Sequence, residues 1–271
     1  MIMEIKCCNE VNFDHVYQAF KEGFSDYIIQ KEISQEDFKS HFFGPEGNRL
    51  IFSFIAYEDE KPVALILGGC KTFEGILTLR CGAMCVVPDY RGRGIALDLM
   101  KRHEKLAVEL GCKQLFLECI TKNEKALNFY LASDYRVIYQ LKYYTRKKHK
   151  SQAGQVVEGD FIDYKDYKDQ VEGRVNWQNE IWYLEGLSPE VKYIKLHDEI
   201  VAMMVHMGPK IAYLHVKKHY RLNGYGKMLV NAIEEKPVRI SFSSQGGLEG
   251  FLTNIGFVED SISQVEMYKF L

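Results

Sequence analysis

Residues 86–96, VVPDYRGRGIA, join the end of an apolar, β-branched run to a segment with helical spacing. Pro88 ends the strand because it cannot donate to a β-ladder. The first N–H groups of a helix have no intrahelical partner and the helix dipole is positive there, so such a turn can hold a phosphate. The two glycines let an anion approach the main chain, and Arg91 and Arg93 add fixed positive charge. The stretch therefore predicts a phosphate-binding turn.

The spacing of these glycines differs from G-x-G-x-x-G and from G-x4-G-K-[ST], so it supports neither a dinucleotide-binding fold nor a P-loop NTPase. It resembles the R/Q-x-x-G-x-G/A signature of the GCN5-related N-acetyltransferase (GNAT) superfamily, here Arg91-x-x-Gly94-x-Ala96. Residues 86–94 also supply the fuller family pattern, hydrophobic-V-x-P-x-Y/F-R-G-x-G. Downstream, residues 123–130 resemble the N-x-x-A-x-x-F-Y helix of the same family.

The order of predicted elements agrees with this resemblance. Periodicity and turn residues predict helices and strands in the first half as follows: helices at 11–24 and from Ser34, where Asp37 completes a capping box, strands at 50–57, 62–71 and 75–87, a helix at 92–111, a strand at 113–120, a helix at 123–132 and a strand at 135–144. The resemblance implies an α+β fold, with a mixed, mostly antiparallel sheet flanked by helices.

The second half repeats this order. Its predicted elements are a helix at about 164–184, strands at 191–196, 200–207 and 211–216, a helix at 222–234, a strand at 238–243, a short helix at 248–254 and a last strand to Leu271.

A second signature, Arg221-x-x-Gly224-x-Gly226, stands at the corresponding place of the repeat. The interval from this signature to the next helix is shorter, which predicts a signature helix about two turns shorter. Leu252 falls where Tyr130 stands, and Gln245 falls where Asn123 stands. The resemblance implies two tandem GNAT-like domains: a catalytic domain at 1–147, a linker at 148–156 and a degenerate domain at 157–271.

The resemblance implies acetyl-CoA as the donor, bound where the strand ending at Val87 diverges from the strand 113–120. Main-chain groups of the first strand would pair with the pantetheine, through Met84, Cys85, Val86 and Val87. The pyrophosphate would lie on the amides of the signature turn, Arg91, Gly92, Arg93, Gly94, Ile95 and Ala96.

Tyr130 is the candidate general acid, because a phenol of pKa about 10 can protonate a leaving thiolate whose conjugate acid has a pKa of about 8.5. The alternative is an aromatic residue that only fills the core. Asn123 is either a cofactor contact or a helix cap.

Glu118, in the strand 113–120, is a candidate base for the incoming amine, directly or through water. The segment between the first two helices holds residues that either line the acceptor side or are solvated, Glu22, Asp26 and Tyr27.

Composition limits the function further. The chain has 35 Lys+Arg against 37 Asp+Glu, which leaves no net attraction to nucleic acid or to an anionic membrane. Its seven cysteines form neither a paired disulfide framework nor a C-x2-C zinc motif, so we expect no metal. No secretory signal and no apolar run of about 18 residues is visible, so we expect a cytoplasmic protein.

These patterns predict an N-acetyltransferase that moves the acetyl group of acetyl-CoA to a primary amine of a small molecule or peptide. Two alternatives remain open: a non-catalytic acyl-CoA-binding or regulatory module, and an aminoacyl transferase of the Fem type. We expect no nucleic-acid or membrane partner, and the resemblance leaves a homodimer open.

Overall fold

The computed structural model describes residues 3–29, 32–147, 155–243 and 247–271 of the chain. The expected linker falls largely outside these residues, as does Gln245. The chain divides into two compact units. Unit 1 comprises Met1–Ile138 and Val265–Leu271, and unit 2 comprises Tyr139–Gln264. Among the described helices, none is long and apolar enough to cross a membrane.

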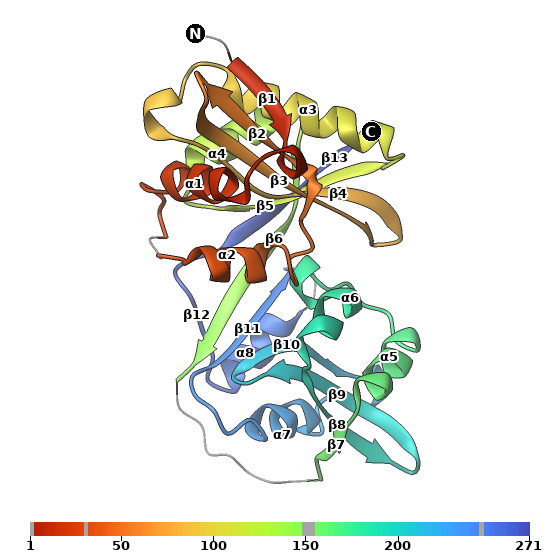
Figure 1. The fold of residues 1–271 in the computed structure, drawn as a ribbon. Coiled ribbons are helices and arrows are strands. Elements are labelled where there is room, and N and C mark those ends of the chain that lie inside the picture. Colours follow the sequence, from red (N-terminus) through yellow and green to blue (C-terminus); the bar gives the residue numbers. More distant parts are fainter. Residues whose placement is uncertain (1–2, 30–31, 148–154, 244–246) are drawn as a thin grey trace. The chain divides into compact units, whose positions relative to one another are not determined.

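The sheet of unit 1 has the strand order β1-β2-β3-β4-β5-β13. Its strands are β1 (Met3–Cys7), β2 (Arg49–Glu58), β3 (Lys61–Phe73), β4 (Ile76–Val86), β5 (Gln114–Ile120) and β13 (Gln264–Phe270) (Figure 1). Strands β1 to β4 pair with their neighbours antiparallel, whereas β4 and β5 pair in parallel. The sheet is therefore mixed and mostly antiparallel, as the sequence predicts.

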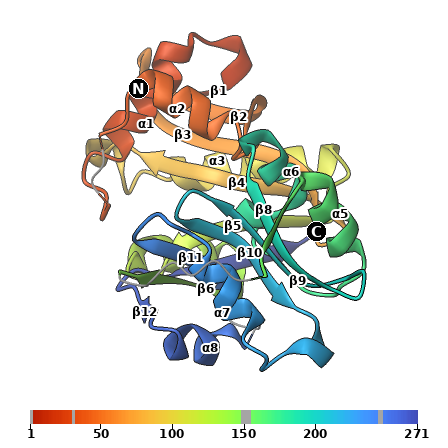
Figure 2. The same ribbon diagram turned by 90° about the horizontal axis from the view of Figure 1, so that it is seen from below.

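Helices cover both faces of this sheet. They are α1 (Phe13–Gly23), α2 (Gln35–Phe42), α3 (Ile95–Glu109) and α4 (Glu124–Ala132). Helices α1 and α2 pack on one face through Val16, Phe20 and Phe38, and α3 packs on the other through Ile95 and Leu99 (Figure 2).

The predicted capping box of α2 is present. The Ser34 hydroxyl accepts from the Asp37 N–H at 3.1 Å and donates to the Asp37 carboxylate at 2.7 Å. This local sequence motif therefore fixes where α2 begins.

Unit 2 has the strand order β6-β11-β10-β9-β8-β7, with β12 beside β6. Its strands are β6 (Arg136–Arg146, which begins in unit 1), β7 (Val157–Gly159), β8 (Glu190–Leu196), β9 (Glu199–Met207), β10 (Lys210–Val216), β11 (Val238–Ser243) and β12 (Val258–Glu259). Its helices are α5 (Phe161–Asp169), α6 (Ile181–Leu184), α7 (Tyr225–Asn231) and α8 (Leu248–Asn254).

The two units repeat local details as well as element order. Asp59 and Glu60 between β2 and β3 have φ values of 47° and 68°, and His197 and Asp198 between β8 and β9 have the same values. Two consecutive positive φ angles are typical of the tight turn of a β-hairpin. The signature helix has 15 residues in α3 and 7 in α7, so it is about two turns shorter in unit 2, as predicted.

The helix predicted at 164–184 is wrong, because it is broken. α5 ends at Asp169, and the chain is helical again only in the short pieces Trp177–Asn179, a 3-10 turn, and Ile181–Leu184. Gly173, at φ 149°, lies in the interruption, where a helix cannot continue. The sequence patterns also did not predict β1, a short strand with alternating polar residues at the edge of the sheet.

The division into units differs from the expected contiguous domains, because the last strand of the chain belongs to unit 1. Strand β13 lies beside β5, and its Val265 and Met267 are buried in the same core as Leu115 and Leu117. Strand β6 instead pairs with β11 of unit 2. Periodicity locates a strand in the sequence, but it does not say which sheet receives that strand.

Candidate functional site

The signature turn in unit 1 has an open, glycine-dependent conformation. Gly92 and Gly94 have φ values of 76° and 83°, in the left-handed region that favours glycine. A Cβ at either position would meet nothing within 4 Å, so the space beside the turn is free. Ile95 and Ala96 form the first turn of α3, where N–H groups have no intrahelical partner. The turn therefore has the geometry of an anion site at a helix N-terminus.

A cleft opens where β4 and β5 diverge. The two strands pair only over Thr78–Cys81 and Gln114–Leu117, and a bulge at Gly82 follows in β4. Beyond the bulge, β4 continues to Val86 with β3 as its partner. The cleft at this divergence has a volume of 760 Å³.

Most of the predicted site residues meet in this cleft. Those that line it are Met84, Cys85, Val86, Arg91, Gly92, Gly94, Ile95, Ala96, Asn123 and Tyr130. Val87, Arg93 and Glu118 are not among the described residues that line it. The opposite wall comes from the segment after α1, which includes Asp26 and Tyr27.

The two signature arginines are engaged by carboxylates of the protein. Arg91 forms a two-pronged ion pair with Asp26, with N–O distances of 2.7 and 2.8 Å. Arg93 donates to both carboxylate oxygens of Glu58 at 3.2 Å and to the Asp89 carbonyl at 2.9 Å. The sequence predicts that both guanidinium groups face a phosphate. Nothing near them in the sequence indicates these distant acidic partners.

Lys122 and Lys125 also line the cleft, next to the start of α4. Neither ammonium group is ion-paired with a residue that the structure describes. They are therefore cationic groups of the cleft that stay available to a phosphate.

Tyr130 lies on α4 with 8% of its surface exposed and lines the cleft. Burial raises the pKa of its phenol well above the usual value of about 10, and the neighbouring Cys81 and Cys119 thiols add to this shift. The phenol is therefore protonated at neutral pH.

Asn123 is a helix cap and also one of the residues that line the cleft. Its side-chain oxygen accepts from the Ala126 N–H at 3.2 Å and so caps α4. The same side chain lines the cleft near Tyr27, whose pKa is raised by burial and lowered by Asn123. The segment after α1 and the start of α4 therefore border the same cleft.

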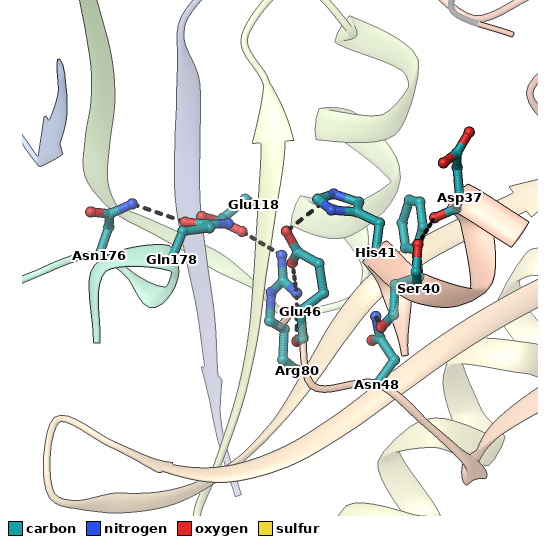
Figure 3. A network of polar contacts seen from close by, with 10 residues as sticks. Asp37, Ser40, His41, Glu46, Asn48, Arg80, Glu118, Asn176 and Gln178 are labelled. Atoms are coloured by element: carbon teal, nitrogen blue, oxygen red, sulfur yellow. Dashed lines mark hydrogen bonds and ion pairs between the residues drawn. The ribbon is translucent and has the colours of Figure 1, made fainter. Parts of the chain in front are cut away.

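Glu118 takes part in a buried ion network. Arg80 on β4 donates to the Glu118 carboxylate at 2.7 Å and to the Glu46 carboxylate at 2.6 Å (Figure 3). Although burial disfavours the cation, the two carboxylates raise the pKa of Arg80. His41 lies 3.7 Å from Glu46 and extends the network towards solvent. The structure therefore places Glu118 in an ion pair with a buried guanidinium and outside the residues that line the cleft.

The cysteines near the cleft behave as apolar residues. Burial raises the pKa of Cys85 to about 12, and that of Cys81 to about 12 as well. Their thiols are therefore neutral at physiological pH and are not nucleophiles. Among the described residues, no group of three or more His, Cys, Asp or Glu side chains is arranged to bind a metal ion.

Unit 2 keeps the backbone of the signature turn. Gly224 has φ 83°, and the Arg221 Nε donates to the Val216 carbonyl at 3.0 Å, as the Arg91 Nε does to the Val86 carbonyl at 2.9 Å. The parallel pairing between β10 and β11 covers two residue pairs, whereas that between β4 and β5 covers four.

The side chains around this second turn differ from those of the first. Phe251 lies 3.0 Å from the position that a Cβ at Gly226 would take. Leu252, at the position of Tyr130, is fully buried in the core of unit 2. A phenyl ring therefore packs against the start of the second signature helix, and a buried leucine stands where unit 1 has its phenol.

Comparison with known proteins shows that unit 1 is similar to acetyltransferases. A model of the Acetyltransferase (GNAT) family matches residues 13–135. The mouse thialysine N-epsilon-acetyltransferase is 31% identical over 115 residues, which is 40% of this chain and 67% of the mouse protein. The Arabidopsis thaliana N-alpha-acetyltransferase MAK3 is 36% identical over 83 residues, 28% of this chain and 40% of the plant protein. The match to this plant relative spans less than half of its length.

Solved structures match the full chain at low sequence identity. A GCN5-related N-acetyltransferase from Sphaerobacter thermophilus has a TM-score of 0.68 at 12% identity, with 99% of this chain and 95% of the other covered. A tandem GNAT protein from the clavulanic acid biosynthesis pathway has a TM-score of 0.69 at 13% identity, with 99% and 98% covered. These matches confirm the α+β fold with two tandem GNAT-like domains. The chain belongs to the acetyltransferase (GNAT) family.

Proposed function

We propose that unit 1 transfers the acetyl group of acetyl-CoA to a primary amine of a small molecule or peptide, with Tyr130 as the general acid. The observation that carries this proposal is the cleft itself. It joins a helix N-terminus suited to a phosphate, an open strand edge and a protonated phenol in one space of 760 Å³.

The donor would lie along the cleft in an extended form. Amides of Gly92, Gly94, Ile95 and Ala96 would bind the pyrophosphate, and the edge of β4 from Met84 would pair with the pantetheine. Lys122 and Lys125 add positive charge at the α4 side of the cleft. In this arrangement the thioester would lie at the divergence of β4 and β5, near Tyr130.

In the transfer, the amine nitrogen attacks the thioester carbonyl carbon, so that a C–N bond forms and the C–S bond breaks. Tyr130 donates its proton to the leaving sulfur, and the attacking amine loses a proton to water. The Tyr130 phenolate then regains a proton from solvent, so that the enzyme returns to its starting state. Glu118 is not assigned as the base, because it is bound to Arg80 and does not line the cleft.

The names of the relatives suggest two acceptor classes to test. The mouse relative acts on the ε-amine of thialysine, and the plant relative on an α-amine. We therefore propose thialysine and a peptide with a free N-terminus as the first amines for an assay of thiol release from acetyl-CoA.

The experiment that tests this function is isothermal titration with acetyl-CoA, read for stoichiometry. We expect one site per chain, located in unit 1. Gly94→Asn and Gly224→Asn form a matched pair, since both glycines have φ 83° and a Cβ at either meets nothing within 4 Å. Asparagine tolerates this conformation, so both variants should fold equally well.

We expect Gly94→Asn to weaken acetyl-CoA binding at least tenfold, because the side chain enters the cleft, and Gly224→Asn to leave it unchanged. The opposite pattern would assign donor binding to unit 2. Absence of acetyl-CoA binding by the unaltered protein would refute the proposal and favour a tRNA-dependent role or a regulatory role without acyl-CoA.

A further inference from the structure

The Arg91 side chain joins two segments that are far apart in the sequence. Its Nη1 and Nη2 atoms donate to the two carboxylate oxygens of Asp26 at 2.7 and 2.8 Å, and Nη2 also donates to the Gly23 carbonyl at 3.1 Å. Two parallel charge-assisted hydrogen bonds fix the orientation of the Asp26 carboxylate relative to the guanidinium as well as the distance between them. The hydrogen bond from Arg91 lowers the pKa of Asp26, so the pair stays charged at neutral pH.

The other end of the same side chain is tied to β4. The Arg91 Nε donates to the Val86 carbonyl at 2.9 Å, and the Arg91 main-chain N–H donates to the Pro88 carbonyl at 3.2 Å. All three guanidinium nitrogens are therefore used by acceptors of the protein. The side chain thus bridges the end of β4, which leads into the signature turn, and the end of α1.

The segment held by this bridge forms one wall of the cleft. Within it, the Tyr27 N–H donates to the Phe24 carbonyl at 3.1 Å, and the two rings pack edge to face at 5.0 Å. Tyr27 and Asn123, at the start of α4, both line the cleft. The path of the chain from Gly23 to Ile28 therefore decides where the Tyr27 ring stands in the cleft.

Close packing restricts the start of this path. A Cβ at Gly23 would lie 2.5 Å from the Cys85 Sγ, so α1 ends directly against β4 with no room for a side chain. The backbone leaves this contact at Phe24, and Asp26 is held next, by its ion pair with Arg91 of the signature turn.

The signature turn of unit 2 keeps one part of this arrangement and lacks the other. Arg221 keeps the Nε bond to the end of its strand, but no described residue offers its guanidinium a carboxylate. The bond to the strand end is therefore common to both signature turns, whereas the fork to Asp26 occurs only in the unit that has the open cleft and Tyr130.

We propose that Arg91 is a positioning residue: through Asp26 it fastens the segment from Phe24 to Ile28 to the signature turn, and so sets the acceptor-side wall of the cleft. Its side chain is not a ligand of the pyrophosphate. The inference rests on the proposed function, since the wall matters for transfer only if an amine enters on that side.

Two variants separate this role from phosphate binding. Arg91→Lys keeps the positive charge but loses the two-pronged geometry. Asp26→Asn removes the carboxylate charge and leaves Arg91 in place. We expect both variants to speed hydrogen exchange of the Tyr27 amide region about tenfold, consistent with loss of a two-pronged ion pair that is partly exposed. Exchange in α3 and β5 is expected to stay unchanged.

In the same variants, titration with CoA should give dissociation constants within about threefold of the unaltered protein. With thialysine or the peptide amine that the assay selects, KM for the amine should rise while KM for acetyl-CoA stays constant. Asp26→Glu, which keeps the carboxylate, is expected to restore part of the amine KM.

A different pattern would overturn the inference. If Arg91→Ala lost tenfold or more in CoA affinity while Asp26→Asn exchanged like the unaltered protein, Arg91 would be a phosphate ligand. Because hydrogen exchange needs no turnover, this result is distinct from failure of the proposed function, which would appear as absence of acetyl-CoA binding in the unaltered protein.

Discussion

Replacement of His103 is expected to change how the stability of unit 1 depends on pH. His103 lies on α3 with no exposed surface, and neither ring nitrogen has a hydrogen-bond partner among the described residues. Its Cε1 lies 3.2 Å from the position of a Cβ at Gly68, so the ring is packed directly against β3. Burial lowers the pKa of the imidazole from 6.5 to about 3.

The direction of the effect follows from proton linkage. Between pH 6.5 and about 3, the unfolded chain binds a proton at His103 and the folded chain does not. Stability therefore falls as the pH is lowered through this range and is unaffected by this group above it. From pH 7 to pH 5 the loss amounts to about 2 kcal/mol.

Urea unfolding followed by far-UV circular dichroism at pH 7, 6 and 5 measures this loss. His103→Leu and His103→Gln both remove the titrating group, one with an apolar and one with a polar side chain. Each is expected to lose about 2 kcal/mol less than the unaltered protein between pH 7 and pH 5, whatever its stability at pH 7. Profiles parallel to that of the unaltered protein within about 0.5 kcal/mol would refute the assigned burial of an uncharged imidazole.

Three further changes test other parts of the structure. Tyr130→Phe should lower kcat of acetyl transfer about 100-fold, whereas Tyr135→Phe, which removes an equally buried phenol outside the cleft, should change kcat less than about twofold in the thiol-release assay. Arg80→Met should destabilise unit 1 by about 3–5 kcal/mol in urea unfolding, because two buried carboxylates lose their partner, and a loss under about 1 kcal/mol would contradict the buried network. Ser34→Ala should cost about 1 kcal/mol through loss of the α2 cap, with Ser34→Asp as the control that keeps the cap.

Local patterns predicted those features of the fold that depend on neighbours in the sequence. The Ser34 cap, the hairpins and the glycine turn at Gly92 and Gly94 each need only a few consecutive residues. The cleft was expected from the resemblance, and most of the residues named for it line one cleft because the signature and the N-x-x-A-x-x-F-Y helix are continuous stretches that flank it.

Contacts between distant residues could not be predicted in this way. Nothing near Arg91 in the sequence indicates that Asp26 takes its guanidinium, and nothing near Glu118 indicates Arg80 and Glu46. Such pairs form only when the sheet and the helices bring their side chains together. The placement of β13 in unit 1 has the same origin, since strand pairing at the end of the chain depends on which sheet edge is available.

Two matching signature turns do not by themselves show that the chain has two active sites. Gly94 and Gly224 share the same φ of 83°, and Arg91 and Arg221 bind the carbonyl at the end of their strands in the same way. This shared geometry connects a strand to a helix and so stabilises the fold in either unit. The difference lies in side chains outside the signature: unit 1 presents Tyr130 to an open cleft, whereas the corresponding position of unit 2 is a buried leucine. The signature geometry alone therefore does not separate the two units, and the proposed assignment of donor binding to unit 1 depends on these surrounding side chains.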